Sequence, residues 1–142
     1  MKETLENLVG LTLTDPSVPT PSCVIDSTKL RHNIERAKAK AAALHVGWRP
    51  HLKTHKSIDI ARLQMSSPEG PATVSTLAEA RYFAQNGVKD IIYAVGIAPQ
   101  KLSAVAAIRR ETGCDLKIIL DSVEAAKLVS EFCRREGVLI PV

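Results

Sequence analysis

The residues best suited to chemistry lie together at positions 48–57, in a stretch that holds one Arg, two Lys and two His. A strand is expected over residues 48–54, and successive side chains of a strand point to opposite faces. The cationic residues at odd-numbered positions then share one face, and the neutral residues between them share the other. Burying cations is costly unless they are paired or used, so we expect an anion to meet this face. The basic residues are Arg49, His51, Lys53, His55 and Lys56.

Three interpretations of this face are open. The strand could lie at a solvated sheet edge, where Lys and Pro protect against edge pairing. It could be a basic patch for nucleic acid. It could also be a site for an anionic ligand with a reactive lysine. In that case the neighbouring cations disfavour a further positive charge, which leaves a lysine amine available as a nucleophile for a Schiff base.

Composition limits the class of protein. The chain has 142 residues, of which 45% are hydrophobic, so it can build one globular domain at most. Its net charge of +4 is local, since residues 29–62 carry nine Lys/Arg and two Asp/Glu. Aromatic residues are only 4%, which disfavours stacking on single-stranded nucleic acid. Three scattered cysteines indicate a reducing compartment. No apolar run is long enough for a membrane span or signal peptide. We therefore expect a cytoplasmic protein with no nucleic-acid or membrane partner.

Repeated strand–helix units are expected to position the basic stretch. The first 21 residues are a lead-in with a weak helix at 3–9, followed by a strand at 22–25 and a helix from Asp26 or Ser27 to about Leu44. Beyond the basic strand, apolar strands are predicted at 72–75, 90–95, 115–120 and 138–142, with a helix before each. Thr76 and Asp121 have the spacing of helix N-caps, and Asp121 also falls at a strand's carboxyl end. The pattern predicts a parallel α/β sheet, either doubly wound or a barrel.

Glycines mark the unit length of this repeat. Gly87, Gly113 and Gly137 each follow a predicted helix, at spacings of 26 and 24 residues. A glycine just past a helix end commonly takes the left-handed conformation that closes the helix. Functional groups gather at the carboxyl ends of strands in such folds, which is where Lys53 and His55 fall.

These residues resemble a known family. Arg-Pro-His-x-Lys-Thr-His-Lys at 49–56 is similar to a signature of the D-serine dehydratase and D-threonine aldolase group, whose members are alanine racemase-like (fold type III) enzymes that use pyridoxal 5′-phosphate. The likeness extends over most of the chain, including Val-Ser-Thr-Leu-Ala-Glu-Ala at 74–80 and Asp-Ser-Val-Glu at 121–124. The pieces at 53–56 and 74–77 look closer to the dehydratase branch.

The resemblance implies roles for the basic residues. Lys53 would hold the cofactor as a Schiff base and act as the catalytic residue. His51 and Arg49 would lie near the pyridine ring or organise the lysine, and His55 and Lys56 would meet phosphate or the substrate carboxylate at the mouth of the site. The substrate would be a small D-3-hydroxy amino acid, and the whole enzyme would be a lyase and a homodimer.

The resemblance also implies that residues 22–142 are only part of a domain. A (β/α)8 barrel needs eight units, and four complete units with the start of a fifth strand are found here. We therefore expect the amino-terminal half of such a barrel, inactive alone, with the phosphate loop, the zinc-like divalent-metal ligands and a β domain elsewhere. A complete, non-catalytic α/β domain that binds an anionic ligand or a partner is the alternative.

Overall fold

A computed structural model describes residues 8–142 and divides the chain into two compact units, residues 1–33 and 34–142. The predicted helix at 3–9 falls almost wholly outside the described residues. The long helix α2 (Ser27–Ala43) begins in the first unit and continues into the second. Its start agrees with prediction, because the Asp26 carboxylate accepts a hydrogen bond from the Lys29 N–H at 3.0 Å.

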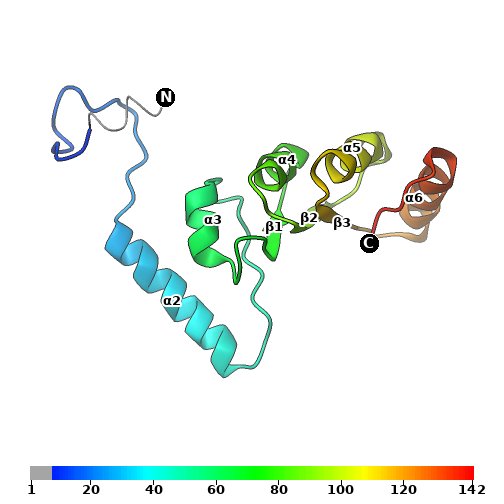
Figure 1. Cartoon of the computed structure of the whole chain (residues 1–142), viewed down its shortest axis with the longest axis horizontal. Coiled ribbons are helices and arrows are strands. Elements are labelled where there is room, and N and C mark those ends of the chain that lie inside the picture. The colour runs from blue at the N-terminus through cyan, green and yellow to red at the C-terminus, as the bar shows by residue number, and fades with distance from the viewer. Residues whose placement is uncertain (1–7) are drawn as a thin grey trace. The chain divides into compact units, whose positions relative to one another are not determined.

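The second unit alternates strands and helices in the predicted order (Figure 1). The elements after α2 are α3 (Ile58–Gln64), β1 (Ala72–Val74), α4 (Leu77–Gln85), β2 (Asp90–Gly96), the short 3-10 helix η1 (Pro99–Lys101), α5 (Leu102–Thr112), β3 (Asp115–Ile119) and α6 (Val123–Glu136). The three strands form one parallel sheet in the order β1-β2-β3. Sequential order with a helix between neighbours is the connection of a barrel, and each half of a doubly wound sheet has it as well.

The helix ends follow from local chemistry. Ser57, Thr76 and Ser122 each have extended backbone and accept an N–H from the first turn of the following helix. The predicted cap at Asp121 is wrong, because the hydroxyl of the next residue, Ser122, accepts the Ala125 N–H at 3.1 Å. The three predicted glycines have positive φ, of 94°, 64° and 63°, as a helix-ending residue requires.

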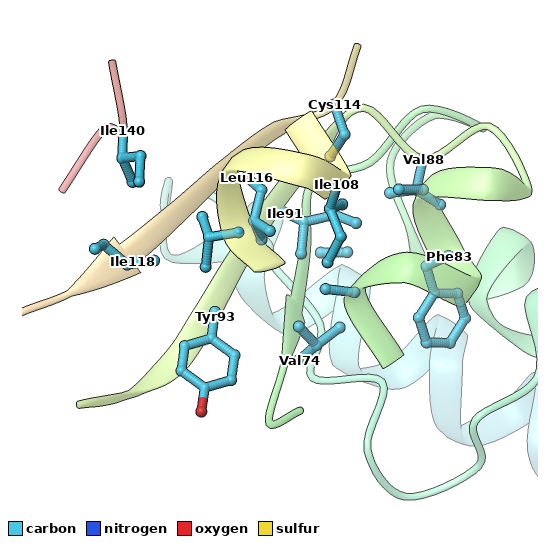
Figure 2. Close-up of a cluster of buried hydrophobic side chains, with 14 of the residues drawn as sticks. Val74, Phe83, Val88, Ile91, Tyr93, Ile108, Cys114, Leu116, Ile118 and Ile140 are labelled. Carbon is cyan, nitrogen blue, oxygen red and sulfur yellow. The ribbon is translucent and has the colours of Figure 1, made fainter. Parts of the chain in front are cut away.

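The core lies on one face of the sheet. Alternate strand residues point toward α4, α5 and α6, and their register partners form rows across the three strands. One row is Ala72, Ile91 and Leu116, and the next is Val74, Tyr93 and Ile118; all six are buried. Figure 2 shows five of these strand side chains in one cluster with Phe83 of α4 and Ile108 of α5; they are Val74, Ile91, Tyr93, Leu116 and Ile118.

The basic stretch is a shorter strand than predicted. Pro50 and Leu52 are buried, so the predicted alternation holds this far, but only His51 forms a bridge, to Thr73 in parallel. The chain then turns from Leu52 to His55. Extension would require Ser75 to donate its N–H to the Leu52 carbonyl. That carbonyl instead accepts the Lys56 N–H at 3.0 Å, and the Ser75 N–H donates to Glu79. The strand prediction for residues 53 and 54 is therefore wrong.

Two other predicted strands are also corrected. Residues 22–25 form no strand in the described structure, and Val24 and Ile25 are exposed. At 138–142 the only ladder contact is the Ile118 N–H to the Pro141 carbonyl, at 3.1 Å. Pro141 has no N–H to return, so the ladder stops there, although Ile140 is buried against the core.

Candidate functional site

The face of the sheet opposite the core carries most of the polar strand residues. Thr73, Ile92 and Lys117 are register partners on this face, and the bridge to Thr73 adds His51 to the same row. We call this the inner face, because it faces away from α4 and α5. Ser75 follows β1 on the same side, one step nearer the carboxyl ends of the strands.

His51 and Lys53 are in direct contact. The backbone N–H of Lys53 donates to Nδ1 of His51 at 3.3 Å. A backbone N–H can only donate, so Nδ1 is an acceptor and the ring proton of neutral His51 lies on Nε2. Nε2 is 3.3 Å from the Ser75 hydroxyl oxygen, to which it can donate. Burial and the adjacent Lys53 charge lower the pKa of His51, and the more weakly felt Glu79 carboxylate does not reverse this.

Lys53 itself is exposed at the start of the turn. Among the described residues its ammonium has no hydrogen-bond acceptor and no carboxylate partner, and only its backbone N–H is engaged. A lysine amine in this state is accessible to a carbonyl compound, which is the requirement for a Schiff base.

His55 and Lys56 both make contacts with residues outside the His51–Lys53 pair. His55 accepts the Ser57 N–H on Nδ1 at 3.0 Å, and its Nε2 lies 2.9 Å from the Gln64 side-chain oxygen. Lys56 has a φ of 50° and places its ammonium 3.4 Å from the Glu79 carboxylate. His55 is therefore held against α3, while Lys56 is directed to the start of α4.

The structure does not bring Arg49 together with His51 and Lys53. Its guanidinium donates to the Ala72 carbonyl at 3.1 Å and pairs with Asp90 at 2.7 Å, and both residues begin strands. The hydrogen bond from Arg49 is the main cause of the lowered pKa of Asp90; burial opposes it, and Lys117 adds to it. Arg49 thus belongs to an ion network at the amino ends of the strands, a position that in such folds supports stability.

Sequence reasoning missed Ser75 and Glu79 as parts of this site. Ser75 contacts His51, and the buried Glu79 pairs with Lys56. The signal was present in the Thr76–Glu79 capping spacing, because a carboxylate at that position must reach back to the start of the helix. That start lies at the carboxyl end of β1, beside the turn that carries Lys53.

Two further properties concern the whole described part. Residues 8–142 contain no group of three or more His, Cys, Asp or Glu side chains that could hold a metal ion. None of the helices in this range combines the length and apolar character needed to cross a lipid bilayer.

The fold is a partial parallel α/β barrel, and the turn that carries Lys53 directly follows the bridge from His51 to Thr73. The family "alanine racemase, N-terminal domain" matches residues 25–142, and the chain belongs to that family. The predicted fold class, the amino-terminal half of a (β/α)8 barrel with parallel strands, is confirmed by the sheet and by solved structures of relatives.

Relatives with named activities include dehydratases and aldolases that are named for D-amino acids. The chain is 43% identical over 121 residues to the D-threo-3-hydroxyaspartate dehydratase of Delftia sp. (strain HT23), covering 85% of this chain and 32% of that protein. It is 33% identical over 119 residues to the D-serine dehydratase of Dictyostelium discoideum, covering 80% and 29% respectively. The chain thus spans about a third of the length of these relatives.

Solved structures agree with this placement. The crystal structure of the Delftia dehydratase superposes with a TM-score of 0.81 at 42% identity, covering 87% of this chain and 32% of that one. A mutant of the same enzyme, solved in the metal-free form, gives the same TM-score. An alanine racemase-like protein of Idiomarina loihiensis superposes with a TM-score of 0.79 at 40% identity, covering 85% and 33%.

Proposed function

We propose that this chain is the lysine-bearing part of a pyridoxal 5′-phosphate-dependent lyase that acts on small D-3-hydroxy amino acids. Family membership and the names of the dehydratase relatives support the reaction class. The observation that carries the proposal is the state of Lys53. Its amine is exposed and unpaired among the described residues, and it follows a neutral histidine at the carboxyl end of the first strand.

The residues present fit the covalent attachment of this cofactor. Lys53 would bind the cofactor aldehyde through Nζ, and His51 would stand beside it. Pyridoxal 5′-phosphate would supply the electron sink that stabilises negative charge at the substrate Cα. Arg49 and His55, expected to contact the cofactor, are bound to Asp90 and Gln64 respectively, so the proposal does not use them for binding.

In the proposed reaction this chain contributes a general base, Lys53, and the residue beside it, His51. When Lys53 is not bonded to the cofactor, its neutral amine can accept the substrate Cα proton. Loss of the β-hydroxyl would follow in a dehydratase, whereas an aldolase would break the Cα–Cβ bond. The homologous dehydratases favour the first reaction for this chain.

Three further expectations belong to the whole enzyme. The metal-free form of a D-threo-3-hydroxyaspartate dehydratase mutant implies that this enzyme can bind a metal. A divalent metal in the whole enzyme here would have ligands other than a cluster within residues 8–142. A homodimer and a cytoplasmic location remain predictions, drawn from the resemblance and from the cysteine pattern respectively.

Labelling tests the proposal directly. Pyridoxal 5′-phosphate is added to the protein, the adduct is reduced with borohydride, and the modified peptide is identified by mass spectrometry. We expect the label on Lys53, its loss in Lys53→Ala, and its retention on Lys53 in Lys56→Ala. A label confined to Lys56 or to scattered surface lysines would contradict the assignment. It would favour the alternative of a non-catalytic domain that binds anions.

A further inference from the structure

Glu79 is a buried carboxylate that the proposed function does not use. It is 7% exposed and is the one charged residue that is buried among residues 8–142. A buried carboxylate must be compensated by hydrogen bonds or charge, since its desolvation is costly. The compensation here comes from two directions, and both lead to the turn that carries Lys53.

The first connection runs through Ser75. Its backbone N–H donates to Oε2 of Glu79 at 2.9 Å, and its hydroxyl lies 3.3 Å from Nε2 of His51. The other nitrogen of His51 accepts the Lys53 N–H. Three consecutive contacts therefore join the Glu79 carboxylate to the backbone N–H of Lys53, on the amino-terminal side of the turn.

The second connection reaches the carboxyl-terminal side of the same turn. The Lys56 ammonium lies 3.4 Å from Oε1 of Glu79. Lys56 takes the left-handed backbone conformation, with φ 50°, and its N–H closes the turn on the Leu52 carbonyl at 3.0 Å. The fully buried side chain of Leu52 anchors the base of the turn.

Helix capping accounts for only part of this arrangement. In a capping box, Thr76 and Glu79 exchange contacts at the start of α4, as the 3.1 Å bond from the Glu79 N–H to the Thr76 hydroxyl shows. Such a cap does not require an ion pair to a residue on a separate turn. Nor does it require the contact between Ser75 and His51.

We propose that Glu79 is a positioning residue for Lys53, which holds the turn at residues 52–56 from both sides through Ser75–His51 and through Lys56. The inference rests on the proposed function, because it assigns Glu79 a task only if Lys53 is the cofactor lysine. Both connections act on the backbone that carries Lys53, so loosening either one disturbs the placement of its amine.

The test measures the reactivity of Lys53 separately from stability. The protein is mixed with pyridoxal 5′-phosphate, samples are quenched with borohydride at intervals, and the modified Lys53 peptide is quantified by mass spectrometry. Thermal melts are recorded in parallel. The variants are Glu79→Gln, Lys56→Gln and the double variant, and Lys56→Arg keeps the cation. The Lys56 side chain is 64% exposed, so its variants should fold even if Glu79→Gln does not.

Glu111→Gln is the matched control. Glu111 pairs with Arg81 between α5 and α4, and has no contact with the turn. We expect Glu79→Gln and Lys56→Gln to slow labelling by on the order of tenfold, because small displacements of a reacting group are costly. Lys56→Arg and the control should label at the wild-type rate. The double variant should be no slower than the slower single variant, because the two residues act as one unit.

Three results would overturn the inference. Lower melting temperatures with unchanged labelling would leave Glu79 as a helix cap only. Rate losses that multiply in the double variant would mean that Glu79 and Lys56 act independently. Absence of a Lys53 label in the wild-type protein would overturn the proposed function and this inference with it, whereas normal wild-type labelling confines any failure to the inference.

Discussion

His51 differs from an ordinary surface histidine because both of its ring nitrogens are engaged. Nδ1 accepts the Lys53 N–H, and Nε2 lies against the Ser75 hydroxyl. Protonation would place a proton on Nδ1 and break the first contact. The lowered pKa, caused by burial and then by the Lys53 charge, agrees with a ring held neutral.

We expect the His51 titration to respond to Lys53. In an NMR titration of the ring protons, the His51 midpoint should fall below that of a reference peptide. Lys53→Gln removes the positive charge, so it should raise the midpoint toward the ordinary value. Lys127→Gln, at an exposed position on α6, is the control and should leave the His51 midpoint as it is in the wild type. Equal His51 midpoints in the wild type and Lys53→Gln would contradict the effect of the Lys53 charge. Folding lowers the pKa of His51, so the unfolded chain takes up a proton at this ring more readily than the folded protein does. Titration of His51 therefore leaves the free energy of unfolding unchanged above the ordinary histidine pKa and lowers it as pH falls below that value.

At the scale of elements, three helix starts depend on one hydroxyl each, whereas the connection after β2 enters η1 and α5 without a side-chain cap. Ser57, Thr76 and Ser122 begin α3, α4 and α6, and each comes between the preceding extended segment and its helix. Two of these helix starts also carry the site, because Ser75, next to Thr76, contacts His51, and the Ser57 N–H donates to His55.

The cap of α6 distinguishes two adjacent residues. Ser122→Ala removes the acceptor for the Ala125 N–H and should lower the free energy of unfolding by about 1 kcal/mol. Asp121→Ala, at the position predicted from spacing, should have a smaller effect. Urea denaturation of both variants measures the difference. A larger loss for Asp121→Ala would show that the carboxylate, and not the hydroxyl, stabilises the helix start.

Sequence patterns predicted the elements of the fold better than the contacts of the site. Strand–helix alternation and three helix-ending glycines are local signals, and they were confirmed over residues 57–137. Strand alternation also placed Pro50 and Leu52 correctly in the core. It failed at Lys53, because the two backbone groups that would extend the strand bond elsewhere. The Leu52 carbonyl accepts from Lys56, and the Ser75 N–H donates to Glu79. Both of these contacts join residues four apart, whereas the lost ladder bond would join Leu52 to Ser75, and alternation alone does not show which contact forms.

The same limit applies to Arg49. Alternation grouped it with His51 on the inner face, and a strand was predicted from residue 90, but the sequence could not show that Arg49 and Asp90 lie at the same level of the sheet. Register between strands decides which residues meet, and register was not readable from one sequence. The resemblance identified Lys53 as the candidate reactive lysine, yet it did not identify the residues that support it.

At the scale of the second unit, one ion network links the amino ends of the sheet. Asp90 pairs with Arg49 at 2.7 Å and with Lys117 at 2.9 Å, and Arg109 of α5 pairs with Asp115 at 3.0 Å. These contacts connect the basic segment, β2, β3 and α5. They lie at the end of the strands opposite to Ser75, so the network and the candidate site can be altered separately.

Asp90→Asn should therefore lower the stability of the protein and leave the labelling of Lys53 unchanged. We expect a loss of about 1 kcal/mol near neutral pH, a modest value because the pair is partly exposed. The pKa of Asp90 is lowered on folding, so its contribution is complete above its ordinary value of 3.8 and is lost as pH falls through the folded-state value. Urea midpoints of wild type and variant should thus converge in acid. Glu131→Gln, at an exposed position on α6, is the control. A penalty that persists unchanged at the lowest pH would contradict the electrostatic explanation.

The left-handed backbone of Lys56 means that the turn stores strain, because a residue with a Cβ at φ 50° gives up roughly 1 kcal/mol relative to glycine. Lys56→Gly should relieve that strain, which offsets the lost ion pair to Glu79, so the melting temperature should stay close to that of the wild type. It would also delete the ammonium that meets Glu79, so Lys53 should be labelled more slowly. His45, at φ 53° beyond α2, allows a matched change, since His45→Gly relieves similar strain without touching the turn. Comparing melting temperature and labelling rate in the two variants would show whether this protein accepts a less stable fold in exchange for a well-placed amine.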